Sequence, residues 1–378
     1  MKLTSSIKNR KSLLTTRILL CIIALIVFES CGTHKPQFEG TPLEKHTSLA
    51  ETGFTQQKLD SLRNYIDENL TTTGMIILKN GKLLFEYGDV QDLSYLASVR
   101  KSILSMLYGK YVENGIIDLD ETIGDIGVEE DSKLTEVEKS ATVYDIINSR
   151  SGVFYTPVNP GSDNNNILER GSKNPGEYFV YNNWDYNVAG YIFEKKTGKD
   201  IYQELEEKLA IPLGFQDWNI KNQKKQYNKN KSRYPAYHMY ISVRDMAKIG
   251  QLMLNKGKWN GKQLISESWI EKITSTVTKT EEINERKGLT KSSPYQLSYG
   301  YMWWIIDNIK HHPDFEGAYH ASGYAGQYIT VIPKLNMVVA HKHRMPNLVR
   351  LGLKSGNDVP YWQYFGLLHD FMTSDRGK

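Results

Sequence analysis

Strand-forming sequence lies near both ends of this 378-residue chain, and a long stretch of different character separates the two parts. Close to the N-terminal end, "GMIILKNGKLLFEYG" (74–88) holds two β-rich runs joined by Asn80-Gly81, a dipeptide typical of tight hairpins. Strand patterns return only over residues 299–306, 326–333 and 337–343. The two ends of the chain must therefore meet to build one sheet.

Apolar residues at helical spacing predict helices in the rest of the chain. The predicted helices cover residues 56–70, 101–113, 142–148, 187–196, 202–209, 243–255, 266–275 and 361–372. We therefore expect an α/β (α+β) fold with two lobes: a sheet lobe covered by helices, about 56–117 and 295–376, and a mainly helical lobe, about 118–294. A cleft between the lobes is the expected place for a site.

Composition and charge exclude few classes of function. Hydrophobic residues make up 40% of the chain and charged residues 24%, as in ordinary globular proteins, and the net charge is only +4. One basic run, "KNQKKQYNKNKSR" (221–233), could be read as a nucleic-acid patch. Its interleaved Asn and Gln and its lack of apolar period favour a solvated loop, so we expect no nucleic-acid partner.

The first residues have the features of an export signal. Residues 1–17 carry five basic residues and no acid, and "ILLCIIALIVF" (18–28) is wholly apolar but too short to span a bilayer. Ser30-Cys31-Gly32 follows, and the whole resembles a bacterial lipoprotein signal. We expect a signal peptide over 1–31, lipid attachment at Cys31, and a location in the cell envelope, on the outer membrane or facing the periplasm. A plain export signal or an uncleaved anchor is the alternative.

Two further expectations concern the boundaries of the mature chain. Residues 32–55 are polar and without period, which predicts a tether, and the main domain should cover 56–376. The two cysteines of the chain, Cys21 and Cys31, both lie in the leader, so the domain has no disulfide to stabilise it.

The segment "LASVRKSILSML" (96–107) places Ser98 three residues before Lys101 at the start of a predicted helix. Residues three apart share one helix face, so the amine would lie near the hydroxyl. A serine hydroxyl becomes a good nucleophile when a neighbour accepts its proton, and a helix start offers N–H groups to a developing oxyanion. The spacing alone is weak evidence, because Ser5-Ser6-Ile7-Lys8 in the leader has it too.

Two other segments give Ser98-x-x-Lys101 a context. "GEYFVYNNWDYNVAG" (176–190) contains Tyr181-Asn182-Asn183 before a helix, and "HASGYAGQYITVIP" (320–333) contains Ser322-Gly323 before a strand. With these motifs the chain resembles the serine β-lactamase and penicillin-binding protein superfamily. It is most similar to the class C-type branch, which includes family VIII esterases, D-aminopeptidases and 6-aminohexanoate-oligomer hydrolases. Segments that fit the same family in the same order are 142–153, 209–218, 241–254 and 299–304.

The resemblance implies a role for each motif residue. It implies an antiparallel sheet flanked by helices, with Ser98 as nucleophile, Lys101 as its activating partner and Tyr181 as a second proton-transfer group. Asn183 would hydrogen-bond near Lys101 or the substrate. The backbone N–H groups of Ser98 and of Tyr324, which follows Ser322-Gly323, would form the oxyanion hole. For Tyr181 the plain alternative is a core tyrosine, since the chain has 24 of them.

The third motif departs from the family pattern. Lys-Thr-Gly supplies a cation for a substrate carboxylate, whereas this chain has Ala321-Ser322-Gly323. His320 is adjacent and could replace the cation weakly, although a lone histidine is more often structural. His341-x-His343 could place two imidazoles on one strand face, but no third ligand is evident, so we expect no metal and no cofactor.

These observations predict an exported serine hydrolase that cleaves a small ester or amide through an acyl-enzyme. One alternative is a D-Ala-D-Ala carboxypeptidase, a D-aminopeptidase or a β-lactamase acting on cell-wall-type substrates. An alternative of another class is a penicillin-binding-like module without catalytic activity. The presence of Ser98, Lys101 and Tyr181 together favours an enzyme.

Overall fold

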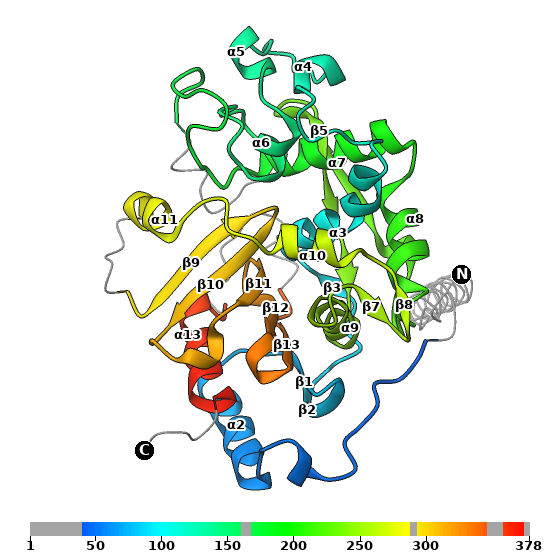
Figure 1. Cartoon of the computed structure of the whole chain (residues 1–378), viewed down its shortest axis with the longest axis vertical. Coiled ribbons are helices and arrows are strands. Elements are labelled where there is room, and N and C mark those ends of the chain that lie inside the picture. Colours follow the sequence, from blue (N-terminus) through cyan, green and yellow to red (C-terminus); the bar gives the residue numbers. More distant parts are fainter. Residues whose placement is uncertain (1–39, 160–167, 288–292, 346–357, 374–378) are drawn as a thin grey trace, which may run out of the picture. The chain divides into compact units, whose positions relative to one another are not determined.

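The computed structural model describes residues 40–159, 168–287, 293–345 and 358–373. A seven-stranded sheet forms its centre, with the strand order β2-β1-β13-β12-β11-β10-β9, and neighbouring strands are antiparallel (Figure 1). These strands are β1 (Gly74–Lys79), β2 (Lys82–Gly88), β9 (Tyr295–Gly300), β10 (Trp303–Ile309), β11 (Ala318–Gly323), β12 (Gln327–Ile332) and β13 (Met337–Lys342). The antiparallel sheet with its helices confirms the predicted fold class.

Helices and short strands make up most of the remaining structure. The α-helices are α2 (Gln56–Asn69), α3 (Val99–Glu113), α4 (Ile123–Ile126), α5 (Glu136–Lys139), α6 (Val143–Ile147), α7 (Asn183–Thr197), α8 (Ile201–Leu205), α9 (Val243–Leu254), α10 (Glu267–Ile273), α11 (Thr280–Lys287) and α13 (Tyr361–Leu367). Short helical turns are η1 (Leu49–Glu51), η3 (Glu206–Ala210), η4 (Ile220–Asn222), η5 (Pro313–Phe315), η6 (Pro333–Leu335) and η7 (Leu368–Met372). Three two-stranded ladders pair β3 (Ser94–Tyr95) with β6 (Tyr240–Ile241), β4 (Lys224–Asn228) with β5 (Ser232–His238), and β7 (Lys258–Trp259) with β8 (Lys262–Gln263).

The two ends of the described chain pair directly in the central sheet. β1 lies between β2 and β13, with Gly74 opposite Lys342 and Lys79 opposite Met337. The turn from β1 to β2 has both Asn80 (φ 52°) and Gly81 (φ 79°) in the left-handed region, as a type I′ hairpin requires. The predicted hairpin and the predicted meeting of the ends are both confirmed.

Alternate side chains of β1 enter two different cores. Ile76 and Leu78 belong to the larger core, to which α3, α7 and α9 also contribute. Met75 and Ile77 point the other way and belong to a smaller core with residues of α2 and α13. The sheet is therefore buried on both faces, which explains why its strands read as continuous apolar runs rather than as alternating ones.

The prediction of one strand over 299–306 was wrong. That stretch contains the end of β9, a turn at Tyr301 and Met302, and the first part of β10. Both turn residues have left-handed φ values, 47° and 71°, yet both side chains are buried. Because the turn is apolar, it carries none of the Gly, Pro or Asn signals that mark a turn in a sequence.

The basic run at 221–233 is not a plain loop either. Most of it forms the β4–β5 hairpin, in which Lys225 donates to the carboxylates of Glu194 (2.6 Å) and Asp200 (2.8 Å). The lysines of β4 project from a short two-stranded ladder, so the segment lacks the apolar face by which a strand is usually recognised.

The predicted tether lies against the domain along its second half. Within 40–55, Thr41 donates to the carbonyl of Gly214, and Lys45 forms a β-bridge with Leu83. The predicted signal peptide and Cys31 lie outside the described residues. Among the residues that are described, no helix is both long and apolar enough to cross a membrane.

Candidate active site

Ser98 lies at the start of α3, at the edge of the larger core. The residue before it, Ala97, is buried and has a left-handed φ of 48°, so the chain turns sharply between β3 and α3. Ser98 is the N-cap residue of α3, but its side chain makes no capping hydrogen bond, and it is half-buried while the residues on either side are buried. The backbone strain at Ala97 is of the kind that often accompanies functional positions.

Lys101 lies one helical turn after Ser98 and is almost completely buried, with 1% of its surface exposed. Its Nζ atom is 3.8 Å from the centre of the Tyr181 ring and 4.0 Å from the centre of the Tyr186 ring. The structure thus brings together Lys101 and Tyr181, two residues from separate motifs of the sequence.

Tyr181 is held by a group of aromatic rings. Its ring centre lies 5.1 Å from that of Tyr186, 5.9 Å from that of Tyr299 and 5.5 Å from that of Trp304. The next residue, Asn182, caps α7 by accepting a hydrogen bond from the backbone N–H of Trp184. Because the cap fixes the start of α7 and the rings fix the side chain, the half-buried Tyr181 has a defined position.

Asn183 is the first residue of α7 and is buried. Its side-chain amide donates to the carbonyl of Asn159 (3.3 Å), and the side chain of Asn159 accepts from Asn187 on the next turn of α7. Asn183 therefore helps to attach the chain at Asn159 to the helix that follows Tyr181.

The third motif reaches the segment of Ser98 through Gly323. A Cβ atom at position 323 would lie 2.5 Å from the carbonyl oxygen of Leu96 and 3.1 Å from the backbone nitrogen of Ser98. Only glycine allows the two backbones to come so close. Gly323 is the last residue of β11, and Tyr324, which follows it, is half exposed.

Ser322 and Gly323 precede the strand β12, as the sequence predicts, but they also form the end of β11, a strand that was not predicted. β11 pairs with β12 from Tyr319 opposite Val331 to Gly323 opposite Gln327. Ser322 is partly exposed, and the preceding Ala321 is completely buried in the larger core. The position at which the family pattern has a cation is thus occupied by a small apolar side chain.

His320 does not replace that cation. Its side chain points to the other face of the sheet, where its ring packs against Tyr328, Tyr364 and Phe365 in the smaller core. Its Nδ1 atom is hydrogen-bonded to the hydroxyl of Thr330 (2.8 Å), and burial lowers the pKa of His320 to about 3. The imidazole is therefore neutral at physiological pH and is separated from Ser98 by the sheet.

His341 and His343 have structural partners. The ring of His341 contacts the hydroxyl of Thr72 (2.7 Å) and the carbonyl of Gly326 (2.7 Å), and His343 contacts the carbonyl of Thr71 (2.6 Å). Burial lowers the pKa of His341 to about 4. Across the described ranges, no three His, Cys, Asp or Glu side chains converge as a metal site would require.

The residues that surround the Lys101–Tyr181 pair are not among those predicted from the sequence. Tyr186 and Tyr299 are completely buried, and their hydroxyl groups are hydrogen-bonded to each other (2.7 Å). Tyr186 follows Tyr181 within one α-helical turn of the start of α7, so its proximity could have been inferred. Tyr299 and Trp304 come from β9 and β10 of the distant sheet region, and nothing in the local sequence links them to Tyr181.

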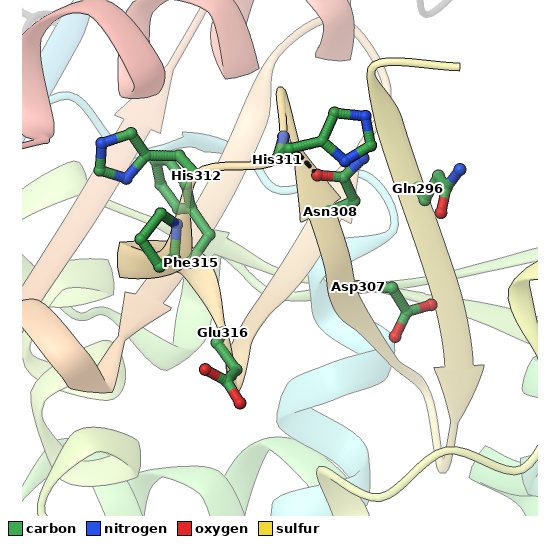
Figure 2. A pocket seen from close by; sticks show the side chains of 8 residues that line it. Gln296, Asp307, Asn308, His311, His312, Phe315 and Glu316 are labelled. Atoms are coloured by element: carbon green, nitrogen blue, oxygen red, sulfur yellow. Dashed lines mark hydrogen bonds between the residues drawn. The ribbon is translucent and has the colours of Figure 1, made fainter. Parts of the chain in front are cut away.

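A surface pocket of about 330 Å³ lies at the other end of β9 and β10 and is separate from this group (Figure 2). Figure 2 shows the Asn308 side chain accepting a hydrogen bond from the backbone of His311 (2.6 Å). The residues that line the pocket are Gln296, Asp307, Asn308, His311, His312, Pro313, Phe315 and Glu316. None of the motif residues is among them, so the pocket does not belong to the candidate active site.

Comparison with known proteins gives consistent matches. The sequence profile of the Beta-lactamase family matches residues 62–341. The 6-aminohexanoate-dimer hydrolase of Paenarthrobacter ureafaciens is 22% identical over 319 residues, which cover 77% of this chain and 76% of that protein. Monacolin J acid methylbutanoyltransferase of Aspergillus terreus is 26% identical over 160 residues, which cover 34% of this chain and 38% of that protein.

Two solved structures share the fold. A candidate 6-aminohexanoate-dimer hydrolase from Bacillus anthracis has a TM-score of 0.61 and 21% identity, covering 89% of this chain and 88% of its own. A mutant of simvastatin synthase from Aspergillus terreus has a TM-score of 0.60 and 16% identity, covering 86% of this chain and 96% of its own. At these identities the likeness concerns the fold.

Proposed function

This chain belongs to the beta-lactamase family, and on that premise we propose that it is a serine hydrolase that cleaves a small, uncharged ester or amide through an acyl-enzyme on Ser98. One observation carries the proposal: buried Lys101, one turn from Ser98, lies against the ring of Tyr181. Ser98 and Lys101 of one motif and Tyr181 of another could therefore supply a nucleophile, a cation and a phenol to the same reaction.

The chemistry requires no group beyond these side chains and the backbone. Ser98 Oγ would attack the substrate carbonyl carbon while Tyr181, together with Lys101, accepts the hydroxyl proton. The proton then passes to the leaving alcohol or amine, and the acyl group stays on Ser98. Water, activated in the same way, releases the acid and returns the proton to Ser98. The backbone N–H groups of Ser98 and Tyr324 are the candidates for the oxyanion hole.

The names of the relatives support acyl transfer as the reaction class. One is named as a hydrolase of the 6-aminohexanoate dimer and another as a methylbutanoyltransferase. Hydrolysis and transfer of an acyl group differ only in the acceptor, and a serine acyl-enzyme serves both. We propose water as the acceptor here, because of these two relatives the hydrolase matches over 77% of this chain and the transferase over 34%.

Cell-wall carboxypeptidase, aminopeptidase or β-lactamase activity is the second candidate, and the residue at position 321 speaks against it. D-Ala-D-Ala peptides and β-lactams carry a carboxylate, and Ala321 is a buried alanine in place of the cation that would bind it. His320 is on the other face of the sheet and neutral. A neutral substrate does not need this cation, so alanine at position 321 should not weaken its binding.

We also propose that the enzyme is exported and anchored by lipid at Cys31. The proposal rests on the basic, then apolar, leader that ends in Ser30-Cys31-Gly32. Its substrate would then be a small molecule that is present in the cell envelope.

The acyl-enzyme is tested by mass spectrometry after treatment with a fluorophosphonate. We expect an adduct on Ser98 in the unaltered protein, no adduct in Ser98→Ala, and loss of ester hydrolysis in that variant. Ser102→Ala is the matched control, because Ser102 is on the same helix and its hydroxyl donates to the carbonyl of Met302 (2.6 Å). It should keep the adduct. Full esterase activity in a folded Ser98→Ala variant would refute the mechanism.

A further inference from the structure

Arg100, on the first turn of α3, carries a buried charge that its neighbours do not balance. It is 2% exposed, and its Nη2 atom donates to the side-chain carbonyl of Asn187 on α7 (3.3 Å). Its Nε and Nη1 atoms are buried without a hydrogen-bond partner, and no carboxylate of the described ranges forms an ion pair with it. A guanidinium cannot lose its proton in a protein, so the charge persists. Buried charges are normally paired, and this one calls for a negative partner.

A second buried donor without an acceptor lies on a neighbouring helix. The hydroxyl of Tyr202 on α8 has no hydrogen-bond partner, and the residue is 6% exposed. Burial raises the pKa of Tyr202 and the charge of Arg100 opposes this rise, so the two groups are close enough to interact. The helices α3, α7 and α8 pack against one another. Two N–H groups and one O–H group that all lack an acceptor therefore lie where three helices meet.

The acidic side chains of α7 and α8 each accept a hydrogen bond from a residue other than Arg100. The donors are Ser151 for Asp185 (2.7 Å), Lys225 for Glu194 (2.6 Å) and Tyr111 for Glu204 (2.6 Å). The second oxygen of Glu204 is buried and has no hydrogen-bond partner, but it forms no ion pair with Arg100. Glu204 is therefore the competing source of negative charge that an experiment must separate from a bound anion.

We propose that Arg100 and Tyr202 bind a small monovalent anion, of the size of chloride, where α3, α7 and α8 meet. The anion accepts hydrogen bonds from Nε and Nη1 of Arg100 and from the hydroxyl of Tyr202, and its single charge balances that of the guanidinium. The site is distinct from the candidate active site, because residues two apart on a helix do not share a face and Arg100 is two residues from Ser98.

This anion site would stabilise the junction of the two helices that carry the motif residues. Ser98 and Lys101 belong to the start of α3, and α7 begins two residues after Tyr181. Asn187, which accepts from Arg100, also donates to the side chain of Asn159 (3.2 Å). Because the anion binds only the folded chain, the stability of the protein should rise with anion concentration.

Thermal unfolding tests the site without any substrate, so the result does not depend on the proposed hydrolase function. Sodium chloride replaces sodium gluconate, whose anion is too large for a buried site, at constant ionic strength. We expect the melting temperature of the unaltered protein to rise by about 2–6 °C between 1 and 300 mM chloride, and bromide to act in the same way. Tyr202→Phe, which keeps the ring, should need about tenfold more chloride for the same rise.

Two arginine variants show whether the effect belongs to this site. Arg100→Met should unfold at a temperature that does not depend on chloride, and it should fold well, because an apolar side chain replaces an ion that is costly to bury. Arg233→Met is the matched control. Arg233 is a surface arginine that pairs with Asp131 (2.7 Å), so its loss should leave the chloride dependence unchanged.

Crystals of the unaltered protein grown in sodium bromide locate the anion directly, even if Arg100→Met does not fold. We expect an anomalous bromide peak within hydrogen-bond distance of Arg100 Nε and Nη1. A melting temperature of the unaltered protein that does not respond to halide, or a water or side chain in place of the bromide, would overturn the proposal. A chloride dependence that arises only in Glu204→Gln would identify Glu204 as the balancing charge and would overturn it as well.

Discussion

Ala321 is the residue with the clearest consequence for substrate choice. Its side chain is completely buried and uncharged, and the cation found here in the family pattern has no replacement in His320. A substrate carboxylate would therefore lose a charge-assisted hydrogen bond worth roughly 1.5–3 kcal/mol, or about ten- to a hundredfold in binding. The effect should depend on the charge of the substrate and not on its size.

A matched pair of substrates tests this consequence. We expect a p-nitrophenyl ester whose acyl chain ends in a methyl ester to be hydrolysed about ten- to a hundredfold better, in kcat/KM, than the same compound with a terminal carboxylate. Short p-nitrophenyl esters should likewise exceed a chromogenic cephalosporin. Because the pKa of His320 is about 3, the ratio should be the same at pH 6 and pH 8. A ratio near one at both pH values would contradict the assignment.

Among the elements, the short β3–β6 ladder determines where the chain enters α3. Ser94 of β3 pairs with Ile241 of β6, and the carbonyls of both residues accept hydrogen bonds from Nζ of Lys342 on β13. Lys342 is buried, and burial lowers its pKa to about 7. A lysine of the central sheet thus holds the strand that precedes Ser98.

This lysine makes stability depend on pH. Between about pH 7 and 10.5 the unfolded chain binds a proton at Lys342 that the folded chain does not, so the free energy of unfolding should rise with pH over that range. Lys342→Met should remove this rise and cost about 1–3 kcal/mol by leaving the two carbonyls without a donor. Urea unfolding at pH 6.5, 8 and 9.5 measures both effects. Lys258→Met, an exposed lysine on β7, is the control that should keep the rise. An unchanged pH dependence in Lys342→Met would contradict the argument.

At the same scale, local sequence signals explain which elements could be predicted. The Asn80-Gly81 hairpin and helices such as α9 follow from turn residues and apolar spacing. The turn at Tyr301-Met302 could not be predicted, because its buried apolar side chains serve the core rather than mark a turn. The residues of the candidate site fall into the same two groups, those that could be predicted from the sequence and those that could not. The motif residues can be read from the chain, but Tyr299 joins them only through the pairing of distant strands.

For the whole molecule, the proposed lipid attachment at Cys31 would decide where the protein works. Metabolic labelling with a palmitate analogue should label the unaltered protein and Cys21→Ala, but not Cys31→Ala, because under this proposal Cys21 belongs to the leader that is cleaved off. Several acyl chains hold a protein on a membrane far more firmly than one, so the label should coincide with the membrane fraction. An unlabelled wild-type protein would exclude lipid attachment.

The pairing of β1 with β13 also means that the central sheet can be completed only after nearly the whole chain has been synthesised. The ribosome makes β1 long before its partner β13, so one edge of the early hairpin keeps its backbone N–H and C=O groups unpaired until almost the whole chain has been made. Pairing across so long a stretch of chain is slow, and an unprotected strand edge invites contacts with other chains. A nascent chain that stops before residue 337 has no partner for β1. We therefore expect prematurely terminated products to be removed by proteases rather than to accumulate as stable fragments.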